Sequence, residues 1–217
     1  DLVDPAPGQV RLRVLTCGVC HSDVLAVEGQ RSDPATPLVP GHEVVGVVDA
    51  VGEGVTGWAV GDRAGLGFLG GPCGQCEWCR RGDYVNCTDQ PLPGTSVDGG
   101  YAEMVYARAS GLVRVPAGLD PVTVAPLLCA GITTYAPLKR WGAGPGRKVA
   151  VLGMGGLGHV AVKIAAAMGA EVTVLSRTDA KKADGLAFGA TDYRATEDGT
   201  AFSELAGSFD VIINTVG

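Results

Sequence analysis

One segment, residues 148–177, limits the fold of this chain more than any other. In KVAVLGMGGLGHVAVKIAAAMGAEVTVLSR, an apolar run ends in the spacing Gly153-x-Gly155-x-x-Gly158, and an alanine-rich stretch then leads to the β-branched run EVTVL. This order predicts strand, glycine turn, helix and strand, the arrangement of a dinucleotide-binding unit. Gly153 permits the tight turn, Gly155 lets the backbone approach a pyrophosphate, and Gly158 allows close helix packing. A glycine-rich turn without a cofactor is the alternative.

The pattern elsewhere predicts a β-rich half before this unit. The alternating runs at 9–15 and 42–51, punctuated by glycine and proline, are typical of half-buried strands. Asp120 followed by Pro121 is a helix-start signal, and the apolar segment after it is expected to be helical. In the second half we expect a parallel, doubly wound sheet. Its strands are expected at 148–153, 171–176 and 209–213.

Composition places the chain among ordinary globular proteins. Its 217 residues are 46% hydrophobic and 18% charged, with a net charge of −6 and no run of Lys or Arg, so we expect no nucleic-acid partner. The apolar segment 149–170 is interrupted by glycines, His159 and Lys163, so we expect no membrane span. Seven cysteines in a chain that can build its own core favour a reducing compartment, the cytoplasm.

Four cysteines fall within the short segment 72–87, PCGQCEWCRRGDYVNC, with the spacing C-x2-C-x2-C-x7-C. They are Cys73, Cys76, Cys79 and Cys87. Four thiolates at such short steps suit one tetrahedral zinc ion and leave no position for a substrate, so the pattern predicts a structural zinc site. Gly74 and Gly82 ease the tight turns between them. An iron–sulfur cluster or a set of redox thiols is the alternative.

A second group of candidate ligands is scattered along the chain. CGVCHSD contributes Cys20, PGHE contributes His42 and Glu43, and PLLCAGITTY contributes Cys129. Taken singly, each is more often a small buried hydrophobe or a side chain with an ordinary structural partner. Together, two cysteines and one histidine match the open Cys2His set of catalytic zinc sites, for which alcohol dehydrogenase is the standard example.

The motifs CGVCHSD, PGHE, GDR, the four-cysteine segment, DGGYAE, PLLCAGITTY and GMGGLGH, in this order, resemble the zinc-dependent medium-chain alcohol dehydrogenases. They are nearest to the branch of cinnamyl alcohol dehydrogenases and bacterial aldehyde reductases. The resemblance covers essentially the whole chain and implies an α/β fold class. It implies a GroES-like catalytic domain in 1–119 with a structural zinc lobe at 72–88, followed by the N-terminal part of a Rossmann domain in 120–217. It also implies a fragment truncated at both ends, and a homodimer or homotetramer at full length.

Residue roles at the catalytic metal follow from the same resemblance. It implies that Cys20, His42 and Cys129 hold a catalytic zinc ion. Glu43 resembles the acid that approaches or transiently binds the metal in these enzymes, with a salt bridge on the barrel surface as the alternative. Asp23 resembles the carboxylate that orients the ligating histidine and favours one imidazole tautomer.

A proton pathway is expected to start at Ser22, whose hydroxyl can both donate and accept a hydrogen bond. His21 resembles the residue that contacts the cofactor pyrophosphate. Many relatives have a histidine where this chain has Leu25. We therefore expect the relay beyond Ser22 to finish through water or another group.

Cofactor contacts are expected at the glycine turn and at the end of the following strand. The first set is Gly153, Gly155, Gly156, Leu157 and Gly158. An NAD enzyme of this type has an acid at the strand end to bind the ribose 2′-hydroxyl. A 2′-phosphate is suited here by the hydroxyl of Ser176 and the positive charges of Arg177 and Lys181. The negative charge of Asp179 opposes it. The sequence therefore predicts NADP(H) in preference to NAD(H).

These observations predict an oxidoreductase with two zinc ions per subunit. It would transfer hydride between NADP(H) and a primary alcohol or its aldehyde, with a small molecule as its partner. One alternative is a polyol or other secondary-alcohol dehydrogenase on the same scaffold. Another is an inactive zinc-binding fragment.

Overall fold

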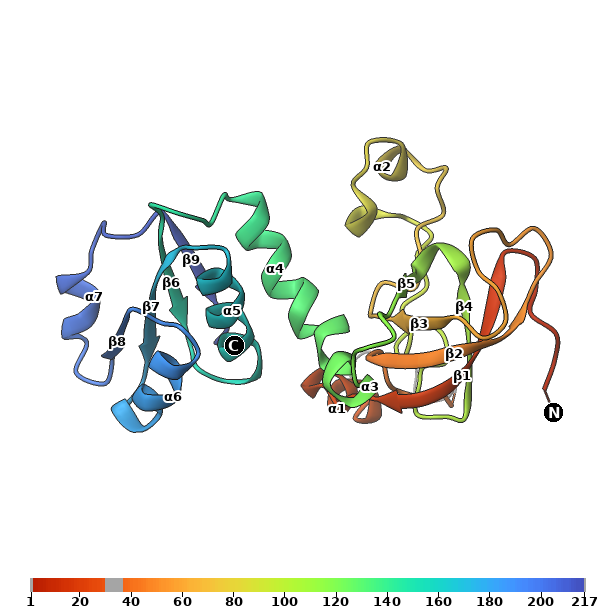
Figure 1. Cartoon of the computed structure of the whole chain (residues 1–217), viewed down its shortest axis with the longest axis horizontal. Coiled ribbons are helices and arrows are strands. Elements are labelled where there is room, and N and C mark those ends of the chain that lie inside the picture. The colour runs from red at the N-terminus through yellow and green to blue at the C-terminus, as the bar shows by residue number, and fades with distance from the viewer. Residues whose placement is uncertain (1, 30–36, 217) are drawn as a thin grey trace. The chain divides into compact units, whose positions relative to one another are not determined.

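The computed structural model describes residues 2–29 and 37–216 (Figure 1). It divides the chain into two compact units, Asp1–Cys129 and Ala130–Gly217. Each unit has a β-sheet and a hydrophobic core of its own.

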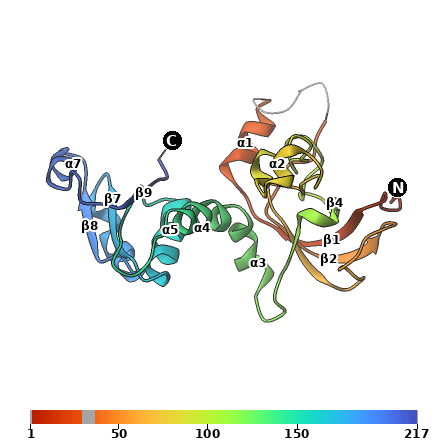
Figure 2. The ribbon, with the colours of Figure 1, turned by 90° about the horizontal axis from the view of Figure 1, so that it is seen from above.

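The first unit is built on a five-stranded antiparallel sheet with the strand order β4-β1-β2-β3-β5. The strands are β1 (Gln9–Cys17), β2 (Val44–Val51), β3 (Arg63–Leu66), β4 (Met104–Arg108) and β5 (Leu112–Arg114). Figure 2 shows β1 and β2 curving together through this unit. The strands expected at 9–15 and 42–51 are confirmed as β1 and β2.

Alternation along β1 explains why one face of the sheet covers a core. Val10 and Leu12 are fully buried, whereas the arginines beside them, Arg11 and Arg13, are more exposed. The inward side chains pack with Val44 and other apolar residues of the neighbouring strands. A period of two with one apolar face is the pattern of a strand that covers a core on one side only.

Short helices lie between these strands and after the last of them. They are α1 (His21–Val27), α2 (Glu77–Arg80), η1 (Tyr84–Asn86), η2 (Ala109–Gly111), α3 (Pro121–Val124) and η3 (Ala125–Leu128). The Asp120 side chain accepts a hydrogen bond from the Val122 backbone N–H at 3.3 Å, so the helix-start signal is confirmed. Val124 packs with Val45 and Val115, which places 121–128 in the first unit, although the sequence had assigned it to the second domain.

The second unit has a four-stranded parallel sheet with the order β8-β7-β6-β9. Its strands are β6 (Lys148–Leu152), β7 (Glu171–Ser176), β8 (Asp192–Ala195) and β9 (Val211–Asn214). Its helices are α4 (Ala130–Arg140), α5 (Gly156–Ala167), η4 (Asp179–Lys181), α6 (Lys182–Ala187) and α7 (Thr200–Glu204). The chain moves outward on one side of β6 to β7 and β8, and then returns to its other side as β9. This reversal of strand order at β6 is the point at which such sheets bind ligands.

Helix α5 packs on the sheet through small side chains. Ala161 and Ala165 are fully buried with Val149 and Val151 of β6 in one cluster. The expected order of strand, glycine turn, helix and strand is confirmed for 148–176. Among the described residues no single helix is long and apolar enough to cross a membrane, although the bent pair Pro121–Leu128 with Ala130–Arg140 reaches that length and composition when joined.

We expect Leu12→Ala to destabilise the first unit because it opens a cavity at a fully buried position of β1. Its free energy of unfolding should fall by about 2–5 kcal/mol, measured by denaturant titration. The control is Val113→Ala, at a half-exposed position of β5, which should cost less than about 1 kcal/mol. Equal losses for the two variants would contradict the burial pattern of the sheet.

Candidate metal centres and cofactor turn

Three separate segments of the first unit bring one group of candidate metal ligands together. Cys20 directly precedes α1, His42 and Glu43 directly precede β2, and Cys129 directly follows η3. Their candidate ligand atoms all lie within 4.8 Å of one another. His42 and Glu43 are buried, and the two cysteines are half-buried. The structure therefore assembles the four residues expected at the catalytic metal.

The spacing of the two thiols in this group fits a zinc ion. A zinc–sulfur bond of about 2.3 Å in a tetrahedron separates two sulfurs by about 3.8 Å. The Sγ atoms of Cys20 and Cys129 are 3.9 Å apart. His42 presents one ring nitrogen, Nδ1, to Asp23 at 3.2 Å, which leaves Nε2 as the nitrogen that can ligate a metal. The donor set of two thiols and one imidazole is thus compatible with zinc.

The Asp23 carboxylate connects the segments that carry Cys20 and His42. Its Oδ2 atom accepts hydrogen bonds from the Cys20 backbone N–H at 2.8 Å and from the Tyr101 hydroxyl at 2.8 Å. Its Oδ1 atom accepts the Gly41 backbone N–H at 3.2 Å and faces His42. Because this carboxylate is buried, these donors replace the water that would otherwise solvate its charge. Asp23 thus lies where the sequence expected it, beside the ligating histidine.

Glu43 contacts the group from the β2 side. Burial raises the pKa of Glu43, and the nearby Asp23 carboxylate raises it further, whereas a hydrogen bond with Cys129 lowers it. Burial also raises the pKa of Cys129, and the adjacent Cys20 and Glu43 add to this effect. Without a cation the Cys129 thiol therefore keeps its proton at neutral pH. A bound metal would have to displace the Cys129 proton, because the thiolate is the ligand.

The four cysteines of the lobe form a second group. Their sulfur atoms lie within 4.8 Å of one another, and Cys73 and Cys79 are 3.9 Å apart, again the separation expected around one zinc ion. Backbone N–H groups of Cys76 and Cys79 point at the preceding sulfurs, at 3.4 and 3.5 Å. Backbone donors lower the pKa values of Cys76 and Cys87, whereas burial raises the pKa of Cys79 to about 12, so a metal would have to displace the Cys79 proton. The lobe is therefore compatible with a four-thiolate metal site.

Arg108 at the end of β4 fixes the base of this lobe to the sheet. Its guanidinium donates to the Asp89 carboxylate at 3.0 and 3.1 Å and to the Gly71 carbonyl at 3.4 Å. The Ser110 hydroxyl donates to the Pro72 carbonyl at 3.2 Å. Both ends of the lobe are therefore fixed, so a metal within it would close a short loop.

In the second unit the glycine turn lies between β6 and α5, as expected. Gly153 has a φ of +93°, and a side chain there would lie 2.8 Å from Thr215 Oγ1. A Cβ at Gly158 would lie 2.1 Å from the Gly153 carbonyl, so the helix starts in direct contact with the turn. The other expected residues, Gly155, Gly156 and Leu157, form the exposed start of α5, with open space at the Cβ positions of both glycines. This surface fits an anionic pyrophosphate.

The residues expected at the cofactor ribose lie close to this turn in sequence and in space. Ser176 is the last residue of β7, and Arg177 follows it on the surface. The Lys181 ammonium donates to the Met154 carbonyl inside the glycine turn, at 2.9 Å. Asp179, the opposing acid, is 4.0 Å from the Lys182 ammonium. Cationic groups are therefore available where a 2′-phosphate is expected.

The residues of the expected proton pathway lie in or beside α1. The Ser22 hydroxyl is 3.0 Å from Cys20 Sγ, so it borders the first metal group. His21 begins α1 and is exposed, and Leu25 is half-buried on the same helix. Ser22 is thus close to the ligands, and Leu25 offers no group that can take its proton.

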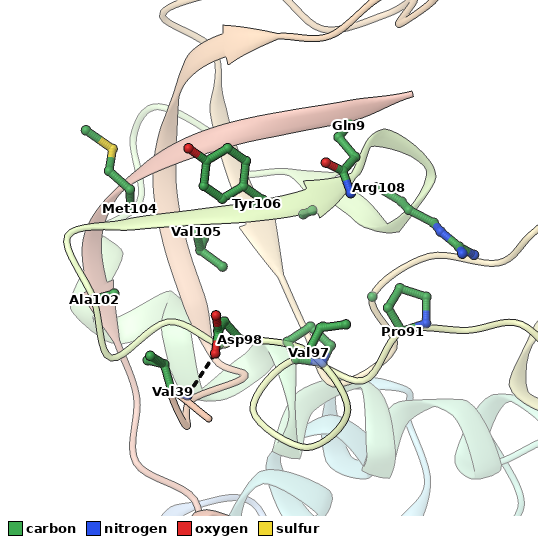
Figure 3. Close-up of a pocket in the computed structure, with 14 residues that line it drawn as sticks. Gln9, Val39, Pro91, Val97, Asp98, Ala102, Met104, Val105, Tyr106 and Arg108 are labelled. Carbon is green, nitrogen blue, oxygen red and sulfur yellow. Dashed lines mark hydrogen bonds between the residues drawn. The ribbon is translucent and has the colours of Figure 1, made fainter. Parts of the chain in front are cut away.

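A cavity of about 460 Å³ lies beside β4 and differs in character from the metal groups (Figure 3). Met104 and Tyr106 project from β4, and the lining includes apolar residues such as Val97. Among the described lining residues Asp98 is the one carboxylate, and it already accepts the Val39 backbone N–H at 3.0 Å. The cavity contains none of the expected metal ligands. The candidate catalytic site is therefore the group around Cys20.

Sequence reasoning missed two aromatic neighbours of the site. The Tyr101 hydroxyl bonds to Asp23, and the Phe68 ring meets the His42 ring edge-on with centroids 5.3 Å apart. Tyr101 was visible in the motif DGGYAE, but the motif alone does not indicate which side chain its hydroxyl meets. Phe68 lies in none of the sequence motifs, so nothing in the sequence indicated that its ring meets His42.

Two family models match this chain. Residues 6–117 match the family model of the alcohol dehydrogenase GroES-like domain, and residues 156–217 match that of the zinc-binding dehydrogenases. The NADP-dependent alcohol dehydrogenase C 1 of Mycolicibacterium smegmatis is 48% identical over 97% of this chain and 63% of its own length.

Solved structures agree as well. A cinnamyl alcohol dehydrogenase from Sorghum bicolor is 37% identical, with a TM-score of 0.91 over 100% of this chain and 64% of its own. CAD from Helicobacter pylori, solved in complex with NADP(H), is 34% identical, with a TM-score of 0.86 over 97% of this chain and 62% of its own. This chain therefore spans less than two thirds of the length of each of these proteins. The expected fold class, a GroES-like unit followed by a Rossmann-like unit, is confirmed.

We expect the protein to bind two zinc ions, one at each group of ligands. Cys129→Ala should remove one ion, and Cys76→Ala should remove the other and chiefly lower thermal stability, because the lobe then loses the ion that closes it. Elemental analysis and thermal unfolding of the purified variants measure both effects. If Cys129→Ala retained two ions, the zinc site at the Cys20 group would be contradicted. If Cys76→Ala retained two ions, the zinc site in the lobe would be contradicted.

Zinc binding at the Cys20 group should strengthen as the pH rises. The raised pKa of Cys129 keeps its thiol protonated in the metal-free protein, and binding releases that proton. The apparent affinity should therefore rise about tenfold per pH unit for each proton released between pH 6 and 8. Competition with a chelator, corrected for the chelator's own protonation, measures this. The Cys129→Ala variant, which should keep only the lobe ion, gives the affinity of the lobe as the reference. A pH-independent affinity would contradict the proton release.

Proposed function

Because the chain belongs to the zinc-dependent medium-chain alcohol dehydrogenase family, we propose that the protein transfers hydride between NADP(H) and a primary alcohol or its aldehyde. The observation that carries this proposal is the convergence of Cys20, His42, Glu43 and Cys129 within 4.8 Å. Structural zinc sites use all four ligands from the protein, whereas catalytic sites keep a position for substrate. Two thiols and an imidazole provide the three permanent ligands of such an open site.

The residues of the first unit prepare this site for a metal. Cys20, His42 and Cys129 would hold a zinc ion, which when bound supplies a Lewis acid that polarises a carbonyl group. Asp23 orients the His42 ring through Nδ1 and so directs Nε2 towards the metal position. Glu43, buried beside Cys129, adds a carboxylate that can approach a cation. These side chains are therefore organised before substrate arrives.

Proton transfer is assigned to Ser22. Its hydroxyl lies 3.0 Å from Cys20 Sγ, and it can accept a proton from the substrate hydroxyl while donating its own onward. Leu25, half-buried on the same helix, has no group that can receive that proton. The next carrier is therefore water or a hydroxyl of the bound cofactor.

Cofactor binding is assigned to the second unit. The N-terminus of α5 and the open glycines before it would receive the pyrophosphate. At the end of β7, Ser176 stands where an acid would repel a 2′-phosphate, and Arg177 can meet that phosphate with a planar fork. Lys181, held at the glycine turn, adds a further positive charge. The NADP-dependent relative and the relative solved with NADP(H) support the same choice.

The function is tested with the zinc-loaded protein. NADPH oxidation is followed with aromatic and aliphatic aldehydes, and the reverse reaction with primary alcohols and polyols. We expect turnover with aldehydes and its loss in Cys129→Ala, since that variant lacks one of the three metal ligands. Turnover of polyols alone would contradict the substrate class. Cytoplasmic location and assembly into homodimers or homotetramers remain predictions.

We expect NADPH to be preferred over NADH by about tenfold to a hundredfold in kcat/KM. The reason is that a charged hydrogen bond from Arg177 to the 2′-phosphate is worth roughly 1.5–3 kcal/mol. The double variant Ser176→Asp with Arg177→Ala should reverse this order. Arg140→Ala, which removes an exposed arginine from α4, is the control and should leave it unchanged. Equal kcat/KM values for both cofactors in the unmodified protein would overturn the assignment of Arg177.

A further inference from the structure

A short strap in the first unit lies along the segment that carries His42. It comprises residues 98–101, DGGY, and runs beside residues 39–41, VPG. The bonds are Gly99 N–H to Val39 O at 2.7 Å, Gly100 N–H to Gly41 O at 2.9 Å, Tyr101 N–H to Pro40 O at 3.0 Å and Val39 N–H to Asp98 Oδ1 at 3.0 Å. Four hydrogen bonds over so few residues fix the strap in one position.

The two glycines of the strap are required by its closeness to this segment. A Cβ at Gly99 would lie 2.1 Å from the Gly41 carbonyl oxygen, and one at Gly100 would lie 2.2 Å from Val44 Cγ2. Both distances are shorter than any van der Waals contact. Side chains are therefore excluded at residues 99 and 100, and Tyr101 follows them on the way to β4.

Tyr101 directs its hydroxyl into the site. The hydroxyl lies 2.8 Å from Asp23 Oδ2 and 3.3 Å from the Gly18 carbonyl oxygen. It has one proton to donate, and the shorter bond to the charged acceptor is the stronger one. The other oxygen of Asp23 faces Nδ1 of His42 at 3.2 Å. A continuous path therefore leads from the phenol through the carboxylate to the imidazole.

We propose that Tyr101 is a positioning residue for the catalytic metal, which acts by holding the Asp23 carboxylate in the orientation that fixes His42. The inference rests on the proposed function, because it assumes that His42 ligates zinc. Without the phenol hydroxyl, Oδ2 of Asp23 retains the Cys20 backbone N–H as its hydrogen-bond donor. The carboxylate is then held by the backbone N–H groups of Cys20 and Gly41, and the direction of the His42 ring is fixed less firmly. Groups that orient a ligating histidine typically change metal affinity tenfold to a hundredfold.

A purely structural role for Tyr101 makes a different prediction. A Cβ at Gly41 would lie 2.8 Å from Tyr101 Cδ1, so the ring itself packs against this segment. If packing were the whole role, phenylalanine would replace tyrosine without consequence for the metal. Tyr101→Phe keeps the ring and removes only the hydroxyl. It therefore separates the two roles.

The experiment compares Tyr101→Phe with Tyr106→Phe in the full chain. Tyr106 on β4 is a matched control, because its hydroxyl also makes hydrogen bonds, donating to the Val3 carbonyl at 2.8 Å and accepting the Val3 N–H at 3.2 Å. We expect Tyr101→Phe to weaken zinc binding at the Cys20 group about tenfold in chelator competition. The visible absorption of the cobalt-substituted protein should also shift, because the ligand geometry changes. Tyr106→Phe should change neither quantity, and both variants should keep the lobe ion.

A double-mutant cycle identifies Asp23 as the intermediary. If Tyr101 acts through Asp23, Tyr101→Phe should have little further effect on zinc affinity once Asp23→Asn is present. Additive losses would overturn the path through Asp23. Unchanged zinc affinity and an unchanged cobalt spectrum in Tyr101→Phe would overturn the inference while leaving the proposed function intact. An unmodified protein that binds no zinc at the Cys20 group would overturn both.

Discussion

The buried carboxylate of Asp23 is the interaction on which the candidate catalytic site depends. A buried negative charge is costly unless several donors surround it, and here the donors come from three different parts of the first unit. The Cys20 N–H comes from the start of α1, the Gly41 N–H from the approach to β2, and the Tyr101 hydroxyl from the approach to β4. Hydrogen bonds to this one carboxylate therefore hold together the segments that carry Cys20 and His42. Cys129 reaches the same group from the end of η3, where its Sγ atom lies 3.9 Å from that of Cys20.

The second unit reaches its function by a different physical route. Close backbone packing organises the glycine turn, and among the described residues no buried charge contacts it. Gly158 lies against the Gly153 carbonyl, and the Thr215 hydroxyl donates to the Leu152 carbonyl at 2.9 Å, so the ends of β6 and β9 are joined beside the turn. The resulting helix start presents unpaired N–H groups to solvent, which is the property that attracts phosphate. The group around Cys20 and the glycine turn are thus each built by the packing of a different unit.

The sequence predicts those parts of the structure whose signals are local. The glycine turn, β6, β7 and the four-cysteine lobe each lie within a short window, and all four formed as expected. Strand β8 had no comparable signal, because DYRA is short and has one fully buried side chain, Tyr193. The bond between Tyr101 and Asp23 spans 78 residues, and no periodicity or spacing encodes it. Segment 121–128 joined the first unit for a similar reason, since its burial depends on Val45 and Val115 in distant strands.

The two metal groups also differ in how they can assemble. In the lobe, the Cys73 backbone N–H donates to Cys87 Sγ, and these two residues are 14 positions apart. A metal that binds the lobe therefore closes only a short loop, which does not require the complete sheet. The Cys20 and Cys129 thiols are separated by 109 residues, and closing so long a loop costs more entropy before any contact offsets it. The Cys20 group therefore depends on long-range contacts, among them the pairing of β1 with β2 and the packing of Val124 against Val45. An ion in the lobe would thus bind a site made of local contacts, whereas an ion at the Cys20 group would bind a site that long-range contacts must first assemble.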